Sequence, residues 1–488
     1  MPESVLSRRG WLKQRFLSAC RGRLWTTLLL LLLLTAGCSA ELSRPLRPTL
    51  PAGAISLYLQ PLPQEAHRLT FSIDELVAVT LDGREIPLPL ATDSLSGDDR
   101  IGRQQRLAQV SLPPGRYLGI ALRITRASLQ GEEGTTDLLP PTEPLRIEHP
   151  FVVAENQADT LLLSLSGERL ITDGVLFTPR FSLWQAERML TTFKGFVSDS
   201  EAGSLTIFNK RTALVTDSVH IGKSPQDLVL DQRRGWLYVA LAKEDAVVVL
   251  EINSGEILGR VRLRFGDEPT ELALTASGDT LLALNSGSDS VSLIDTAALF
   301  ERGRVRLTSS PAELFVGRDE NRAYVSQSDS SVLSLLDLSG GGRVLSSRVL
   351  DQVPARGAVS PDGQRIYLLS DYSPDLLVVN ASSLGTERKI HVGHGARDLL
   401  LDETSGLLYI AKEDGEIAVV DPRSLTAIDF FTLPGPVRRL SIDREENALF
   451  ALMPQNGSLA KINLVSKRVL SQLDVGSGSR DLAVMGER

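Results

Sequence analysis

A pair of short apolar runs separated by a polar turn recurs along residues 194–488, and it constrains the fold more than any other feature. The segment WLYVALAKEDAVVVLE from Trp236 returns in outline as TLLALNSGSDSVSLID from Thr280 and as RIYLLSDYSPDLLVVN from Arg365. A chain that repeats one outline builds one structural unit repeatedly. Aligned on the two runs, the copies begin at Lys194, Trp236, Thr280, Arg322, Arg365, Leu407 and Ala448.

Each copy has room for four short strands, because the copies average about 42 residues. The first half closes on a polar residue that can hydrogen-bond nearby backbone and start a turn, and the second half carries another strand pair. The closing residues are Asn209, Glu251, Asp295, Asp337, Asn380, Asp421 and Asn463. These dimensions predict a seven-bladed β-propeller over residues 194–488. A solenoid of similar period is the alternative, but its repeats are mostly helical and no helical pattern is visible.

The ends of the repeat predict how the ring closes. The first copy lacks the proline-led strand of the others, and the last copy stops on SRDLAVMGER, which is that strand alone. We therefore expect the carboxyl-terminal strand to complete the first blade and hide its edge. The segments LLYIAKEDGEIAVVD and AVSPDGQRIYLL resemble the YVTN-repeat (lactonase-like) family, and the resemblance implies a seven-bladed propeller.

Strict two-residue alternation dominates residues 54–186, as in RYLGIALRITRASL and RLTFSI. Period two indicates half-buried strands, and turn signals separate the runs. We predict an all-β chain whose amino-terminal part is an antiparallel β-sandwich of roughly seven strands. The segments LPPGRYLGIALRI, EHPFVV and LFTPRFSL resemble a β-sandwich domain of unknown function from bacterial lipoproteins, which implies a fold and a surface location but no activity.

Residues 1–37 have the layout of a signal peptide. A basic stretch runs into LWTTLLLLLLLTAGC, which is shorter than the ~20 apolar residues that a spanning helix needs. LTAGCS resembles the lipobox of bacterial lipoproteins, which implies that Cys38 is acylated and that residues 38–53 form a linker. Ser39, and not Asp, follows the cysteine, which resembles the sorting signal of lipoproteins that go to the outer membrane. An ordinary secretory signal is the alternative. SRRGWLK resembles a twin-arginine motif, although the leucine-rich core favours the general secretory route.

The charge distribution bears on possible partners. Residues 1–37 carry a net +5, so the formal net charge of −8 becomes −13 once they are removed. An acidic chain repels phosphate backbones, and we expect no nucleic-acid partner. Cys20 lies in the part to be removed, so the mature chain keeps no cysteine beyond Cys38 and forms no disulfide.

Conventional catalytic signatures are missing from the sequence, which contains no G-x-S-x-G, H-E-x-x-H or phosphate-binding glycine loop. His391 and His394 are the only closely spaced histidines, and we interpret them as loop residues without a metal. We therefore expect no catalytic residues, no cofactor and no metal.

One position near the start of the proline-led strands, which run innermost in propellers, is charged in every copy. It is occupied by Asp227, Glu271, Glu313, Arg356, Asp398, Arg439 and Asp481, and arginine precedes it at Arg397, Arg438 and Arg480. One interpretation is a ring of ion pairs lining a wet channel. The other is a ligand or peptide site whose arginines bind a carboxylate or phosphate.

Acidic residues also recur in the loops between the first two strands of each copy, which open on the same face. The charged residues of these loops are Asp199, Glu201, Lys243, Glu244, Asp245, Asp289, Asp329, Asp371, Asp375, Glu413 and Asp414, all acidic except Lys243. Solvation explains such a run, and a cation site is the alternative.

These features predict a lipoprotein of the bacterial cell envelope, held in the outer membrane by its lipid anchor on the periplasmic or surface side. The propeller is expected to bind or scaffold, with an envelope protein or an anionic small molecule as partner. The alternative is a lactonase-like hydrolase that uses the central funnel.

Overall fold

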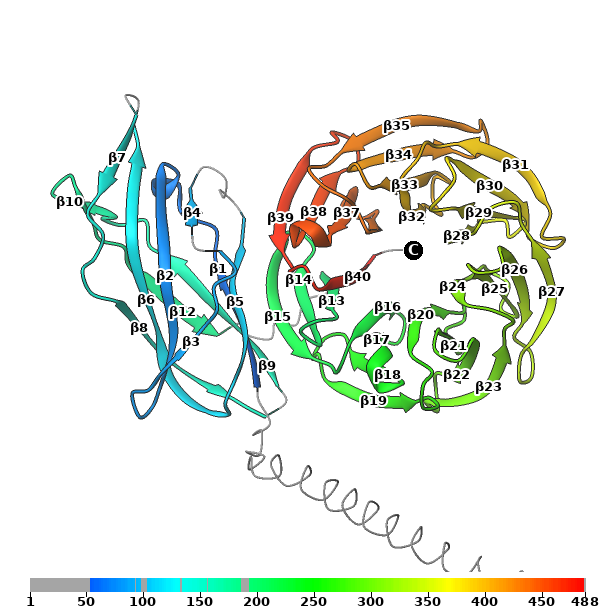
Figure 1. The fold of residues 1–488 in the computed structure, drawn as a ribbon, viewed down its shortest axis with the longest axis horizontal. Helices are drawn as coiled ribbons and strands as arrows, with labels where there is room; N and C mark the ends of the chain where they lie inside the picture. The colour runs from blue at the N-terminus through cyan, green and yellow to red at the C-terminus, as the bar shows by residue number, and fades with distance from the viewer. Residues whose placement is uncertain are drawn as a thin grey trace, which may run out of the picture. The chain divides into compact units, whose positions relative to one another are not determined.

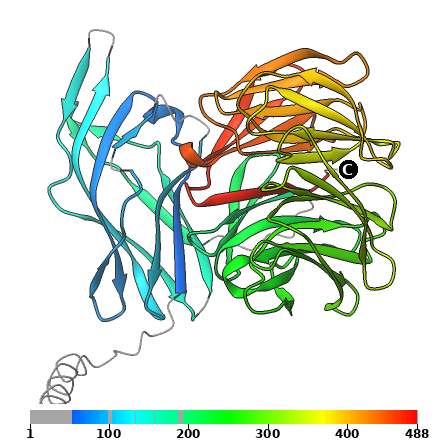
Figure 2. The same ribbon diagram turned by 45° about the vertical axis from the view of Figure 1, so that its right-hand side comes forward.

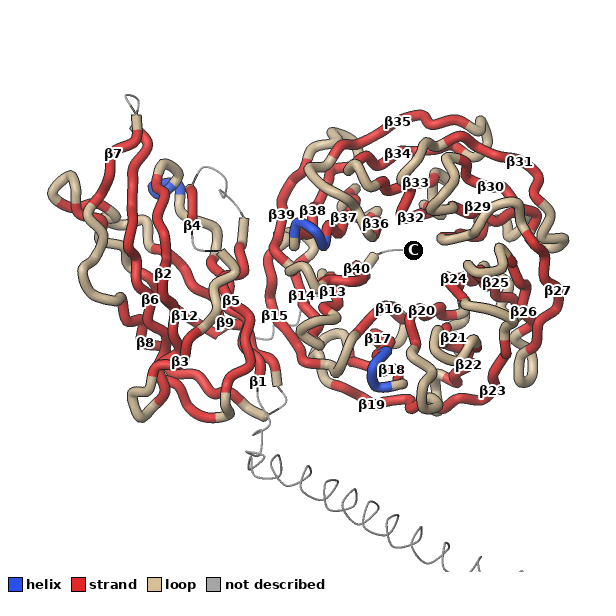
Figure 3. The backbone as a smooth tube through the Cα atoms, viewed as in Figure 1, coloured by secondary structure: helices blue, strands red, loops and turns tan. Residues whose placement is uncertain are grey.

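The computed structural model describes residues 53–92, 94–97, 103–131, 134–155, 157–185 and 193–486. The chain is all-β in these ranges: its helical elements there are three single-turn 3-10 segments, η1 (Gln64–Ala66), η2 (Ala242–Glu244) and η3 (Pro454–Asn456) (Figure 3). The signal peptide, Cys38 and residues 38–52 of the predicted linker lie outside the described residues, and Gly53 already belongs to the first strand, β1. No helix within the described ranges has the length and apolar character needed to cross a membrane.

Two sheets form the amino-terminal part, which we call the sheet pair (residues 53–185) (Figure 2). The first has the order β12 (Phe181–Gln185), β9 (Ala158–Leu165), β1 (Gly53–Leu59), β5 (Gln105–Leu112). The second has the order β3 (Glu85–Pro87), β2 (Leu69–Thr80), β6 (Gly115–Gln130), β7 (Thr135–Leu138), with β4 (Ser94–Ser96) beside β2 and β8 (Leu145–Val153) beside β6. A small ladder joins β10 (Ile171–Thr172) to β11 (Leu176–Phe177).

The sheet pair has one core, built from the alternating apolar residues that the sequence predicts to face inward. Leu57 and Leu161 of the first sheet and Phe71 and Ile120 of the second are buried in the same cluster. Tyr117 donates its hydroxyl hydrogen to the carbonyl of Pro113 at 2.8 Å, a corner that β-sandwiches use to fix a turn. The expectation of a purely antiparallel arrangement was wrong, because β1 pairs with β9 in parallel.

Among residues 193–486, seven sheets have four antiparallel strands each. From inner to outer strand, the first four are β40 (Ser479–Val484), β13 (Lys194–Asp199), β14 (Ser204–Asn209), β15 (Leu214–His220); β16 (Pro225–Asp231), β17 (Trp236–Leu241), β18 (Ala246–Glu251), β19 (Ile257–Arg262); β20 (Pro269–Leu274), β21 (Thr280–Asn285), β22 (Ser290–Asp295), β23 (Phe300–Arg306); and β24 (Pro311–Val316), β25 (Arg322–Gln327), β26 (Val332–Asp337), β27 (Arg343–Val349). The other three are β28 (Arg356–Val359), β29 (Arg365–Leu369), β30 (Asp375–Asn380), β31 (Thr386–His391); β32 (Ala396–Leu401), β33 (Leu408–Lys412), β34 (Glu416–Asp421), β35 (Thr426–Thr432); and β36 (Arg439–Asp443), β37 (Ala448–Met453), β38 (Ser458–Asn463), β39 (Val469–Asp474).

These sheets are arranged around a common centre as in a β-propeller (Figure 1). The two middle strands of each sheet are largely buried on both faces because each sheet packs against its neighbours on either side. Leu205 of β14, for example, shares a buried cluster with Val239 of β17 in the next sheet. This explains why the repeat shows continuous apolar runs rather than alternation.

Polar residues that close the first half of each copy start the following turn, as predicted. Asp295 accepts the backbone N–H of Ala297 at 2.9 Å, and Asn463 accepts that of Val465 at 3.0 Å. Equivalent bonds are made by Asn209, Glu251, Asp337, Asn380 and Asp421. The polar position that marks the repeat is thus a turn former.

The carboxyl-terminal strand β40 pairs with β13, with Phe196 opposite Ala483 and Val197 opposite Leu482. It is therefore the inner strand of the sheet that begins at Lys194. We call the junction between this sheet and the sheet β36–β39 the seam. Phe208 and Phe450 meet there with ring centroids 5.8 Å apart.

A short segment of the sheet pair, residues 103–106, contacts both sides of the seam. The buried Gln104 accepts the backbone N–H of Val215 in β15 at 2.7 Å and forms an isolated bridge with Leu473 in β39. Arg106 donates to the carbonyl of Val475 at 3.3 Å. These bonds attach the sheet pair to the place where the first and last sheets meet.

Candidate functional site

The charged position of the proline-led strands lies on the innermost strand of each of the seven sheets. It is occupied by Asp227 in β16, Glu271 in β20, Glu313 in β24, Arg356 in β28, Asp398 in β32, Arg439 in β36 and Asp481 in β40. Their side chains are at most 16% exposed. We call these seven residues the channel ring, and sequence reasoning placed all seven in equivalent positions.

Three aspartates of the channel ring bind backbone of the next sheet. Asp481 accepts a hydrogen bond from the backbone N–H of Leu228 at 2.8 Å. Asp227 accepts one from Leu272 at 2.6 Å. Asp398 accepts one from Leu440 at 2.8 Å. A buried N–H without a partner is costly. Each of these aspartates, on the inner strand of one sheet, supplies the acceptor for a backbone N–H on the inner strand of the next sheet. The aspartates therefore act first as links between sheets.

Two arginines of the channel ring, Arg439 and Arg356, form ion pairs with its carboxyl groups. Arg439 lies 3.0 Å from Asp481, 3.3 Å from Asp398 and 3.2 Å from Glu271. Arg356 lies 3.1 Å from Glu271 and also pairs closely with Glu313. These positions form one buried ion network.

The network contains five carboxyl groups and two guanidinium groups, so not all the carboxyl groups can ionise without an unbalanced buried charge. Burial raises the pKa of Glu313 to about 8. Burial and the neighbouring Asp481 raise the pKa of Asp227 well above its ordinary value. Burial also acts on Glu271, but Arg439 and Arg356 outweigh it and hold the pKa of Glu271 below its ordinary value.

Of the arginines that stand one position earlier, Arg397 and Arg438 line the mouth of the channel and Arg480 does not. The three differ in their partners. Arg397 pairs closely with Glu413 and lies 3.4 Å from Asp371. Arg438 donates to the carbonyl of Arg480 at 3.2 Å, and Arg480 donates to the Ser200 hydroxyl at 3.1 Å.

Neither Arg438 nor Arg480 has a carboxylate within ion-pair distance among the described residues. The pKa of Arg438 lies below its ordinary value because the guanidinium is partly withdrawn from water and because Arg439, Arg480 and Arg356 are near. The neighbouring guanidinium groups therefore gather positive charge around Arg438. Such a site favours an anion.

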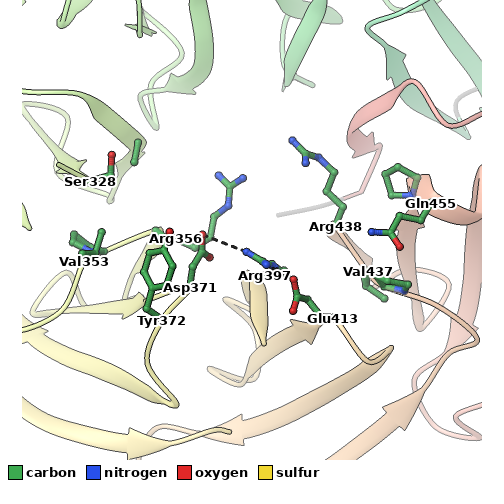
Figure 4. Close-up of a pocket in the computed structure, with 15 residues that line it drawn as sticks. Ser328, Val353, Arg356, Asp371, Tyr372, Arg397, Glu413, Val437, Arg438 and Gln455 are labelled. Carbon is green, nitrogen blue, oxygen red and sulfur yellow. Dashed lines mark hydrogen bonds and ion pairs between the residues drawn. The ribbon is translucent and has the colours of Figure 1, made fainter. Parts of the chain in front are cut away.

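A cavity of about 520 Å³ opens at this mouth. Figure 4 shows the guanidinium groups of Arg356 and Arg438 extending into one open space, with Arg397 turned toward Asp371. The lining includes Val353, Pro354, Tyr372, Glu413, Pro436 and Val437. This volume is typical of small-molecule sites.

Sequence reasoning did not identify the uncharged walls of this cavity. Tyr372, Pro354 and Pro436 lie in loops and strand-leading segments, where proline is an ordinary turn residue and a single tyrosine gives no pattern. The sequence held one clue to these walls: Tyr372 follows Asp371, which lies in a loop that was predicted to open on this face.

The histidine pair has no metal-site geometry in the structure. His391 lies 3.0 Å from Asp375 at the exposed end of β31. Across the described ranges, no group of three or more His, Cys, Asp or Glu side chains is arranged to hold a metal ion.

The comparisons with known proteins agree with this architecture. Residues 202–405 match the model of the YNCE-like beta-propeller family. The chain contains a β-propeller. No curated protein sequence matches it significantly.

Two solved structures are similar in fold to this propeller protein. A protein of unknown function from Desulfotomaculum acetoxidans is 10% identical with a TM-score of 0.55, covering 60% of this chain and 99% of its own. A candidate 6-phosphogluconolactonase from Bacteroides uniformis is 15% identical with a TM-score of 0.51, covering 60% of this chain and 98% of its own. At these identities the likeness shows the fold alone.

Proposed function

We propose that this propeller protein is a binding module of the bacterial cell envelope, and that its ligand is an anion bound at the channel mouth by Arg438 and Arg480. One observation carries the proposal: Arg438 lines a cavity of about 520 Å³, Arg480 is joined to it by the bond from Arg438 to the Arg480 carbonyl, and neither arginine has a carboxylate partner among the described residues. The whole chain has a net charge of −8, so this positive site is local and is not a by-product of composition.

The ion network of the channel ring supports this assignment by exclusion. Arg356 and Arg439 are already neutralised by carboxylates, and Arg397 is neutralised by Glu413. A new anion at these three would compete with bonds that exist. At Arg438 and Arg480 it would form charge-assisted hydrogen bonds without breaking an ion pair.

The location within the cell is part of the proposal. The LTAGCS sequence supports acylation of Cys38 and an outer-membrane lipoprotein, with a β-sandwich domain and a seven-bladed propeller beyond the anchor. Labelling with a fatty-acid analogue tests the anchor. The native protein should carry the label and Cys38→Ser should not, whereas equal label in both would overturn the anchor.

Binding is tested by thermal shift and calorimetry with benzoate as the anion and benzylamine as a cation of similar size. We expect benzoate to bind and benzylamine not to bind. Arg438→Gln with Arg480→Gln should abolish benzoate binding, because both free guanidinium groups are gone. The control is Arg468→Gln, an exposed arginine that precedes β39. Benzoate binding that survives the double substitution would contradict the site.

Hydrolysis of an anionic lactone is a second candidate function, which Glu313 favours. Its raised pKa of about 8 suits a general base near neutral pH, and its partner Arg356 lines the mouth cavity. A panel of lactones, with and without divalent metal, tests this function. Turnover that disappears in Glu313→Gln supports hydrolysis, and no turnover of any lactone excludes it for that panel.

A further inference from the structure

The mouth cavity has apolar walls in addition to its arginines. Tyr372 is 81% exposed, so its ring has apolar surface that a ligand could cover. Val353 and Pro354 lead into β28, and Pro436 and Val437 lead into β36. These side chains border the same cavity as Arg438 (Figure 4).

The two kinds of wall would serve different parts of one ligand. Arg438 offers a positive charge with no carboxylate within ion-pair distance among the described residues, while Tyr372 and the half-buried Val353 and Pro436 offer surface that gains by being removed from water. A bare inorganic anion would pair with the arginines but leave the ring of Tyr372 exposed to solvent. An uncharged apolar molecule would cover the tyrosine and leave the arginines without an anion.

Acidic residues of the same cavity limit how much negative charge a ligand can carry. Asp371 and Glu413 lie in the lining beside Arg397. A second anionic group placed near them would meet like charges. The lining therefore favours a single anionic group over a polyanion.

We infer that the mouth cavity selects an amphipathic anion: one carboxylate, sulfonate or phosphate group attached to an apolar or ring-shaped body. The anionic group would bind Arg438 and Arg480, and the body would lie against Tyr372 and the proline segments. This inference rests on the proposed function and adds the apolar half of the ligand to it.

Calorimetry with phenyl phosphate, inorganic phosphate and benzyl alcohol tests the inference. We expect phenyl phosphate to bind at least about tenfold more tightly than inorganic phosphate, because the ring adds buried apolar area. Benzyl alcohol has the ring without the charge and should bind much more weakly than phenyl phosphate. Arg438→Gln should reduce the binding of both phosphates.

Tyr372→Ala isolates the apolar wall. It should reduce the affinity for phenyl phosphate about tenfold and leave that for inorganic phosphate unchanged, while Tyr372→Phe keeps the ring and should bind normally. Phe430→Ala is the matched control, since Phe430 is 61% exposed on the outer strand β35. Equal melting temperatures of the variants show that the fold is kept.

The possible failures are distinguishable. If both phosphates bind equally and both need Arg438, the inference is overturned and the proposed anion site stands. If neither phosphate binds, the proposed function fails as well. If benzyl alcohol binds as tightly as phenyl phosphate, the cavity is only apolar and the inference is wrong.

Discussion

The Nζ of Lys210 lies 2.9 Å from Oδ2 of Asp443, and both side chains are almost completely buried, at 1% and 0% exposed. Lys210 lies in the turn that follows β14 in the first sheet of the propeller. Asp443 is the final residue of β36 in the last sheet. The same ammonium group donates to the carbonyl of Met485, just after β40, at 2.8 Å. One cation therefore holds together the three parts of the chain that meet at the seam.

Removing this cation should destabilise the propeller strongly. Lys210→Met leaves Asp443 buried without a counter-charge, which costs about 3–5 kcal/mol in comparable buried pairs. Urea unfolding measures the loss. Lys210→Met with Asp443→Asn should recover much of it, since the charge is gone and the amide oxygen still accepts the N–H of Glu445. A single variant as stable as the native protein would contradict this role of the pair.

Deleting the chain from Ser479 onward should remove the inner strand of the first sheet. Leu482, Ala483 and Val484 are buried there, and burying one such Leu or Val side chain contributes about 1.5–3 kcal/mol. The exposed edge of β13 adds to the loss, so we expect a large fall in melting temperature. Deletion of residues 487–488 alone is the control. If the two truncated proteins melt alike, β40 does not close the propeller.

The contact of the sheet pair with the seam should also stabilise the protein. Gln104→Ala leaves the buried N–H of Val215 without its acceptor, which costs about 1–3 kcal/mol. Gln157→Ala changes an exposed glutamine of the sheet pair and serves as the control. Urea unfolding of the intact chain compares the two, and equal free energies of unfolding would show that the bond does not stabilise the seam.

The protonated carboxyl groups of the channel ring predict a pH dependence of stability. The pKa of Glu313 rises from 4.5 to about 8 on folding, so between these pH values the native state binds a proton that the unfolded state has lost. The free energy of unfolding should therefore fall as pH rises from about 4.5 to about 8. Asp227 contributes in the same direction. Glu271, with its lowered pKa, acts in the opposite direction, but only below a pH of about 4.5.

Glu313→Gln keeps a neutral hydrogen-bonding side chain at this position and removes its titration. Unfolding curves collected across this pH range should show a shallower decline for the variant than for the native protein. Parallel curves would mean that Glu313 is ionised in the folded state and that other groups hold the proton.

Sequence patterns were sufficient for the strands of residues 194–488 and for the charged position of their inner members. They were not sufficient for the sheet pair, whose described residues form twelve strands, β1 to β12, where roughly seven were expected. The pattern could not separate the roles of those charges, because the roles depend on side-chain length and on the neighbouring sheet. Asp398 reaches the backbone N–H of Leu440 at 2.8 Å, while the longer Glu271 bonds to the two arginines of the ring.

The arginines show the same limit. Arg438 and Arg439 are neighbours in sequence, and on an extended strand they face opposite sides. Arg439 enters the ion network and Arg438 faces the cavity. Which arginine keeps a free charge depends on loops such as the one carrying Glu413, whose path a repeat pattern does not specify. The parallel pairing of β1 with β9 joins segments about 100 residues apart, beyond the reach of local periodicity.

Crystals soaked with 4-iodobenzoate test the central claim most directly, because the anomalous signal of iodine locates the ligand independently of any assay. We predict one strong iodine peak in the mouth cavity beside Tyr372, with the carboxylate bound by Arg438 and Arg480, and no such peak in Arg438→Gln with Arg480→Gln. An iodine peak that persists in the variant, or a cavity left empty while iodobenzoate occupies another surface, would contradict the account.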